Sequence, residues 1–203
     1  MKITAIKQQV RREGRYSVFV DGKYSFSLSG DALLQSKLVL GQELGAGEVR
    51  ELKQTSADDQ LYNVTLRYIA LRPRSRWELE QYLKRKKASP PLLDSILNKL
   101  SINGFLDDRR FAEAYVHDRR LLRPTSLRRL QLELRQKHVS TEVINDVLGE
   151  DEVPDQEVLQ ELIARKRKQT KYQDDLKLMQ YLARQGFNYG DIKDALQSQL
   201  PED

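Results

Sequence analysis

The sequence predicts a mainly α-helical protein, in which three tandem three-helix units resembling helix-turn-helix motifs follow a small N-terminal extension that contains a β-hairpin. Residues 1–30 form the one region with strand signals, and residues 23–28 alternate polar and apolar with a period of two, which is typical of strands. From residue 47 onward apolar residues recur every three or four positions, which is typical of amphipathic helices. The helical pattern repeats at an interval of about 50 residues, so we expect stacked units in an elongated, curved array.

The extension is predicted to hold a small sheet. Residues 15–20 and 23–28 are rich in β-formers and flank Asp21 and Gly22, a pair that favours a two-residue hairpin turn. Residues 3–10 are expected to add a third strand, because an isolated hairpin is only marginally stable in water. A short helix should then begin at Ser29.

Capping residues and prolines punctuate the helical region. We expect a short helix at 48–53 and a separate, longer helix that begins at Ser56 and stops at Pro73. Ser75 is placed to cap the next helix, with Glu78 at the third helical position of a capping box. The third helix of this unit opens at Ser89-Pro90 and ends at Gly104.

The unit recurs further along the chain. Arg72-Pro73-Arg74-Ser75 returns at an offset of 51 as Arg123-Pro124-Thr125-Ser126, and a weaker third copy follows at an offset of 99. We predict an extension at 1–47 and repeats at 48–105, 106–150 and 151–203. The acidic stretch 149–155, which contains Pro154, is predicted to be a flexible joint between the second and third repeats.

The run from Gly104 to Arg119 joins the first repeat to the second. Gly104 suits the left-handed conformation that ends a helix, and Asp107 is placed to cap the next one. Leu106 and Phe111 have the spacing of a hydrophobic staple.

This run resembles the RecX family of bacterial regulators, which act on the RecA recombinase. The resemblance rests on a glycine, an aromatic residue and a leucine before two aspartates, followed by Arg-Phe-Ala and an aromatic residue with valine, and it extends over roughly residues 1–197. It implies three tandem three-helix repeats. It also implies a regulator that lodges in the groove of the RecA filament on single-stranded DNA, blocks strand exchange, and lowers ATPase and coprotease activity.

Composition argues for binding and against catalysis. The chain has no cysteine, two histidines, no glycine-rich phosphate loop and no apolar run long enough to cross a bilayer. Asp107 and Asp108 are interpreted as helix caps and not as a metal or acid–base site. We therefore expect a cytoplasmic, monomeric protein that is not an enzyme, needs no cofactor or metal and does not bind membranes.

The candidate binding residues are basic. The net charge is +5, but residues 61–149 alone hold 18 Lys and Arg against 10 Asp and Glu. Such an excess favours an anionic partner, and the expected partners are the RecA filament, single-stranded DNA and, more weakly, duplex DNA. The candidates are Arg72, Arg74, Arg76, Lys84, Arg85, Lys86, Arg120, Arg123, Arg128, Arg129, Arg135 and Lys137.

Three alternatives stay open at this point. The repeats could act as a free-standing DNA-binding protein without sequence specificity, although the starts of the second helices offer only Arg and Gln for base contacts. The chain could equally be a protein-binding scaffold that makes no contact with DNA. For any single cation, ordinary solvated surface charge is the simplest interpretation.

Overall fold

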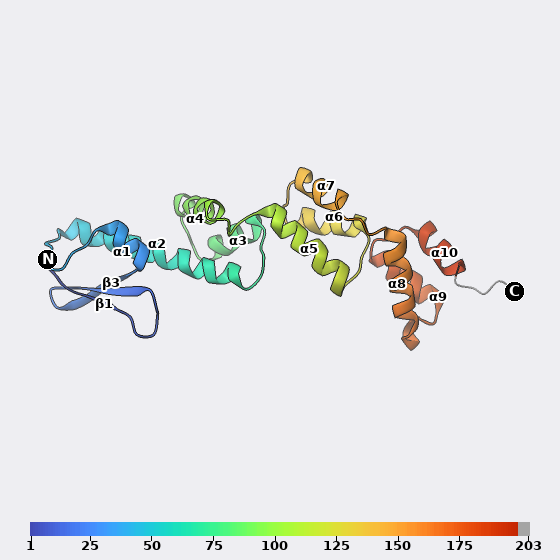
Figure 1. Cartoon of the computed structure of the whole chain (residues 1–203), viewed down its shortest axis with the longest axis horizontal. Helices are drawn as coiled ribbons and strands as arrows, with labels where there is room; N and C mark the ends of the chain where they lie inside the picture. The colour runs from blue at the N-terminus through green and yellow to red at the C-terminus, as the bar shows by residue number, and fades with distance from the viewer. Residues whose placement is uncertain (199–203) are drawn as a thin grey trace. The chain divides into compact units, whose positions relative to one another are not determined.

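A computed structural model describes residues 1–198 of the chain (Figure 1). It divides into two compact units, one formed by Met1–Arg72 with Ala88–Ile96 and the other by Pro73–Lys87 with the residues from Leu97 onward. Residues 199–203, which the predicted third repeat includes, lie outside the described residues. No helix in the described range is long and apolar enough to span a bilayer.

The elements confirm a mainly helical fold with a small N-terminal sheet. The strands are β1 (Ile3–Gln8), β2 (Arg15–Val20) and β3 (Lys23–Ser29). The helices are α1 (Gly30–Ser36), α2 (Ala46–Ala70), α3 (Arg76–Arg85), α4 (Pro90–Ile102), α5 (Asp108–Leu122), α6 (Leu127–Gln136), α7 (Thr141–Gly149), α8 (Asp155–Arg167), α9 (Asp175–Arg184) and α10 (Tyr189–Gln197). A short 3₁₀ turn, η1 (Thr170–Tyr172), lies between α8 and α9.

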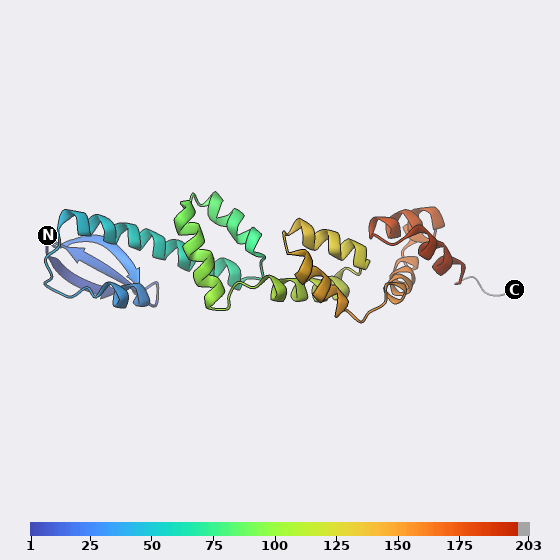
Figure 2. The same cartoon turned by 90° about the horizontal axis from the view of Figure 1, so that it is seen from above.

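The N-terminal unit is a three-stranded antiparallel sheet with helices packed against it. The strand order is β1-β2-β3, so the predicted hairpin and the third strand are both present. Helix α2 packs along β3, as the view in Figure 2 also shows. Ile3, Val18 and Leu28 are fully buried in the core of this unit, because alternate side chains of each strand point toward the helices.

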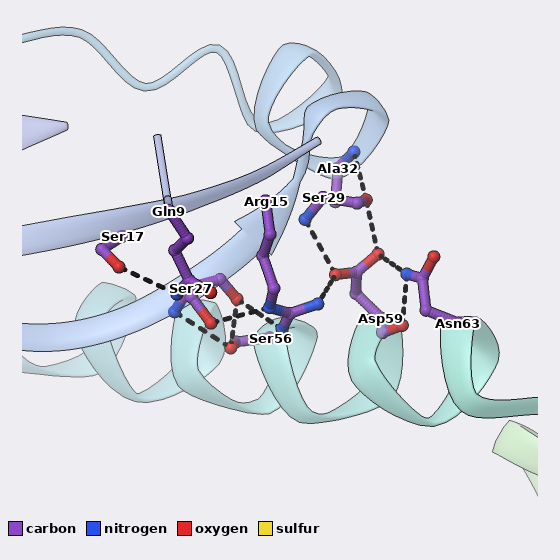
Figure 3. A network of polar contacts seen from close by, with 9 residues as sticks. All are labelled: Gln9, Arg15, Ser17, Ser27, Ser29, Ala32, Ser56, Asp59 and Asn63. Atoms are coloured by element: carbon purple, nitrogen blue, oxygen red, sulfur yellow. Dashed lines mark hydrogen bonds and ion pairs between the residues drawn. The ribbon is translucent and has the colours of Figure 1, made fainter. Parts of the chain in front are cut away.

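A buried polar network ties the sheet to α2 (Figure 3). The Arg15 guanidinium lies 3.1 Å from the Asp59 carboxylate, and both side chains are about nine-tenths buried. Asp59 also accepts from the hydroxyl of Ser29 at 2.6 Å. Ser56 donates to the carbonyl oxygen of Ser27 at 2.6 Å. Because each charged or polar group has its partner, the network holds the helix in register on the sheet.

The prediction of two separate helices, one at 48–53 and one that begins at Ser56, is wrong, and this network explains why. The structure has one continuous helix, α2, that begins at Ala46, and the Glu48 carboxylate accepts from the amide of Gly45 at 2.6 Å to close its first turn. Ser56 lies within this helix, and its hydroxyl bonds to the sheet instead of capping a helix start. No proline or glycine interrupts residues 48–70, so nothing breaks the backbone hydrogen bonds there.

The second unit contains the cores of the second and third repeats. Leu130, Leu134 and Ile144 are completely buried where α5, α6 and α7 meet. Leu178 and Ile192 are completely buried where α8, α9 and α10 meet. The leucine and isoleucine positions that recur in the sequence are therefore the core positions of each repeat, as their spacing predicts.

Candidate functional site

Helices α3 and α6, the second helices of the first two repeats, begin in the same way. Ser75 caps α3 and Ser126 caps α6, each with its hydroxyl accepting an amide of the first turn. The first amide of each helix is bound by an aspartate of the following repeat. Asp108 accepts from the amide of Arg76 at 2.7 Å, and Asp155 accepts from that of Leu127 at 2.9 Å. Each helix start is thus fixed by the next repeat along the chain.

These contacts settle the roles of two acidic segments. Asp107 caps α5 and Asp108 binds the start of α3, so both act as caps, as predicted. Burial raises the pKa of the Asp108 carboxyl, although the hydrogen bond from the amide of Arg76 works in the opposite direction. Two contacts bridge the stretch 149–155, which composition predicts to be a flexible joint: Asp151 binds Arg120 at 2.7 Å, and Asp155 binds the start of α6.

Helix α6 also contacts the end of α9. The carbonyl oxygen of Gln185 accepts from the hydroxyl of Thr125 at 2.7 Å and from the amide of Ser126 at 3.2 Å. Gly186 follows with a left-handed backbone, φ +93°. A Cβ atom at this glycine would lie 2.5 Å from the Ser126 hydroxyl oxygen and 2.8 Å from Cβ of Arg129. Only glycine therefore permits this approach of the two helices.

An open groove of about 780 Å³ lies beside this contact. Arg128, Arg135 and Arg184 line it and are all exposed. Their side chains make no hydrogen bond or ion pair with any residue that the structure describes, and the lining includes no Asp or Glu. We call this feature the arginine groove. Its apolar lining comes from Leu132, Ala183, Tyr181 and Phe187.

A fourth arginine that lines the groove, Arg129, forms an ion pair with Glu133. The Glu133 carboxylate lies 2.9 Å from Nε of Arg129 and 2.8 Å from Nη2 of Arg119, and it accepts from the hydroxyl of Tyr115 at 2.9 Å. Burial would raise the pKa of Glu133, but the hydrogen bonds from Arg129 and Tyr115 and the charge of Arg119 outweigh it, so that the pKa is lowered. Arg129 is therefore held within the protein, unlike the other three arginines of the groove.

The structure brings only some of the predicted binding residues together. Arg128, Arg129 and Arg135 line the groove, whereas Lys137 pairs with Glu78 at 2.8 Å. Arg120 is mostly buried against Asp151 and donates to the carbonyl oxygen of Thr125, which assigns it to packing between repeats.

The other predicted cations lie away from the groove. Lys84, Arg85 and Lys86 are exposed at the end of α3, and Arg123 is exposed at the end of α5. Arg72 and Arg76 are exposed on either side of the half-buried Arg74, in the segment that leads into α3. The groove thus gathers three of the predicted residues, Arg128, Arg129 and Arg135, at one hollow surface.

Sequence reasoning missed Arg184. It lies at the last position of α9, about 50 residues from the other arginines, and it has no neighbouring cation. The repeat itself carries the signal that would have found it. The end of α9 meets the start of α6, and the end of α6 likewise meets the start of α3, although different bonds join the two contacts.

No group of three or more His, Asp and Glu side chains is arranged to hold a metal ion within the part of the chain that the structure describes. His117 is exposed on α5, and the ring of His138 stacks on Trp77 with centroids 4.7 Å apart. Both histidines thus lie where surface or packing roles account for them.

Comparison with known proteins matches the chain to four RecX domain models in succession. Residues 1–45 match the regulatory protein RecX N-terminal domain, and residues 62–100, 107–148 and 154–196 match the first, second and third three-helix domains of RecX. A crystal structure of regulatory protein RecX superposes with a TM-score of 0.73 at 27% identity, covering 95% of this chain and 98% of that one.

Named relatives agree with the domain matches. Regulatory protein RecX of Bacillus subtilis is 28% identical over 199 residues, which is 96% of this chain and 75% of the relative. That of Lactobacillus johnsonii is 32% identical over 73% of this chain, and the match spans 54% of the relative's length. The chain thus spans about half the length of several relatives it matches. With all four domains in order and a matching fold, this chain belongs to the RecX family of regulatory proteins.

Proposed function

We propose that this protein is a non-enzymatic regulator that binds the filament formed by RecA on single-stranded DNA. It inhibits the recombinase, ATPase and coprotease activities of that filament in recombination and DNA repair. The observation that carries the proposal is the succession of four RecX domains along the chain. Relatives that match this chain are named regulatory protein RecX, and the name RecX points to RecA as the regulated protein.

The distribution of charge supports an anionic partner of this kind. Exposed cations on α3 and α5 supply salt-sensitive attraction for the DNA within a nucleoprotein filament, and more weakly for duplex DNA. Their spread along the repeats suits contact with several places on a repeating polymer. The protein acts as a monomer and needs no cofactor.

The test is a DNA-dependent ATPase assay of purified RecA, with the protein titrated in at two salt concentrations. The proposal predicts inhibition that saturates with added protein and weakens at the higher salt, because charge pairs at the contact are screened. The absence of inhibition at both salt concentrations would contradict it.

Naked duplex DNA provides the second arm, because it separates the proposal from free-standing DNA binding. The proposal predicts that the protein prefers the filament over duplex DNA. Tight binding to duplex without any change in ATP hydrolysis would instead favour a DNA-binding protein built from helix-turn-helix-like units.

A further inference from the structure

We infer that the arginine groove binds an acidic segment of a partner protein, one that carries an apolar side chain between its carboxylates, and that it does not bind nucleic acid. The assignment of RecA as the protein that carries this segment rests on the function proposed above. The chemistry of the segment rests on the groove alone.

The charge of the groove calls for an anion. Arg128, Arg135 and Arg184 are exposed, lack side-chain partners among the described residues and surround a lining with no carboxylate. A guanidinium presents its donors as a planar fork that matches a carboxylate or a phosphate in two-point contacts. Three such groups around one hollow favour a ligand with several negative charges.

The apolar part of the lining distinguishes between the two kinds of anion. Leu132 is 49% exposed beside the arginines, and Ala183 is exposed next to Arg184. A polypeptide can place a carboxylate and an aliphatic side chain within a few ångströms of each other, so it can use both parts of this lining. The volume of about 780 Å³ is of the size that holds a few side chains.

The aromatic residues argue against nucleic acid. Proteins hold single strands by stacking bases on free aromatic faces, in addition to binding phosphates. The ring of Tyr181 is already in contact with Tyr172, at 5.1 Å between centroids, and with the ammonium group of Lys166 at 4.6 Å. Phe187 is buried. The groove therefore offers no free ring on which a base could stack.

The groove is a property of one contact between repeats and not of the repeat as such. Two positions after the helix cap, α3 has Trp77 where α6 has Arg128, and Trp77 stacks on His138. His138 and Gly186 both have a left-handed backbone after the end of their helix, but the glycine has no side chain to fill the space. Side chains thus fill the contact between α3 and α6, whereas the groove lies open where α6 meets α9.

The experiment compares two triple variants with the same change in charge. The groove variant is Arg128→Glu, Arg135→Glu and Arg184→Glu. The control is Arg11→Glu, Arg12→Glu and Lys23→Glu, at three exposed cations of the N-terminal unit. Circular dichroism checks that both are folded. Binding is then measured to RecA filaments on single-stranded DNA and to a naked oligothymidine strand.

The inference predicts that the groove variant binds the filament at least about tenfold more weakly than the control, because three favourable charge contacts become repulsive. Its affinity for oligothymidine should equal that of the control. An equal loss of affinity for oligothymidine and filament, or filament binding that matches the control, would overturn the inference.

A model peptide separates this inference from the proposed function. If the wild-type protein does not bind RecA filaments, the proposed function fails. A synthetic peptide of alternating Glu and Leu then tests whether the groove binds an acidic segment with apolar side chains. Groove-dependent binding of this peptide, with weaker binding of a Glu and Ser peptide, supports the inference; equal binding by both triple variants refutes it. Should the groove variant not fold, Leu132→Ser is compared with the wild-type protein instead, and it should weaken filament and Glu-Leu peptide binding while leaving oligothymidine binding unchanged; unchanged filament and peptide binding would refute the inference.

Discussion

The contact between α3 and α6 and the contact between α6 and α9 are built on the same plan but completed differently. In both contacts, the start of the second helix of one repeat meets the end of the second helix of the following repeat. The first is joined by side chains: Trp77 stacks on His138, and Lys137 pairs with Glu78. The second is joined through the backbone of residues 185–186, and it leaves Arg128, Arg135 and Arg184 without side-chain partners among the described residues.

The difference shows how a repeat protein can change one contact into a binding surface without altering its helices. Where the first contact uses opposite charges and stacked rings, its polar groups are satisfied within the protein. Where Gly186 brings the backbones together instead, the side chains on either side remain available to a partner. Stability and binding are thus assigned to different contacts of one architecture.

The largest expected effect is on the backbone-mediated contact. Gly186→Ala should lower the free energy of unfolding by about 2–4 kcal/mol, because it adds left-handed strain and a close contact with Ser126. Urea denaturation followed by circular dichroism measures the loss. Gly104→Ala is the control, since Gly104 has φ +71° with open space around it and should cost only about 1 kcal/mol. Equal losses would show that the close approach contributes nothing.

Removing the charge of Glu133 should have the next largest effect. Glu133→Gln should lower the free energy of unfolding by about 2 kcal/mol at neutral pH, because Arg119 and Arg129 lose a buried carboxylate. The pKa of Glu133 is lowered in the folded protein from the ordinary 4.5. The carboxylate therefore stabilises the fold above that ordinary value, and this advantage disappears as pH falls through the folded pKa.

The measurement is the difference in unfolding free energy between wild type and Glu133→Gln across a pH series. It should shrink steadily below pH 4.5. Glu152→Gln, at an exposed glutamate of the 149–155 stretch, should show almost no difference at any pH. A difference for Glu133→Gln that does not change with pH would contradict the stabilising role of its charge.

A smaller effect is expected where side chains join the repeats. His138→Ala should lower stability by about 1 kcal/mol, through loss of the stacked ring. Trp77 is the only tryptophan of the chain, so its fluorescence reports directly on this contact. The emission should shift in His138→Ala and stay constant in His117→Ala, because His117 is exposed on α5. Unchanged emission in both variants would rule out the stack in solution.

The smallest expected effect concerns the ion pair of the same contact. Lys137→Gln should cost about 0.5 kcal/mol, because the lysine is partly exposed and water screens the pair with Glu78. Urea denaturation at low and high salt measures it. The cost should fall at high salt, and a cost that is independent of salt would point to packing instead of charge.

Local sequence signals were sufficient to predict most of the fold. Ser75 and Asp107 cap the helices for which they were proposed, Ser126 caps α6 at the position where the Ser75 segment recurs, and the recurring leucines are the core. The single helix α2 was missed because the role of Ser56 depends on a strand 29 residues away. A serine that bonds across to Ser27 cannot be told from a helix cap by its neighbours in sequence alone.

The groove could be predicted only in part. Arg128 and Arg135 were identified from charge, but charge alone also selected Arg120 and Lys137, which are paired within the protein. Their partners Asp151 and Glu78 lie 31 and 59 residues away, so the pairing follows from how the repeats stack. Arg184 was missed for the same reason.

The central claim is that the arginine groove is where this protein meets the protein component of the filament. Site-specific photo-crosslinking tests it most directly, with a photoreactive side chain placed at position 135 in the groove or at position 23 in the N-terminal sheet. We predict cross-links from position 135 to RecA and none to the DNA, with position 23 giving neither. Cross-links from position 135 to DNA alone, or equal cross-linking to RecA from both positions, would contradict it.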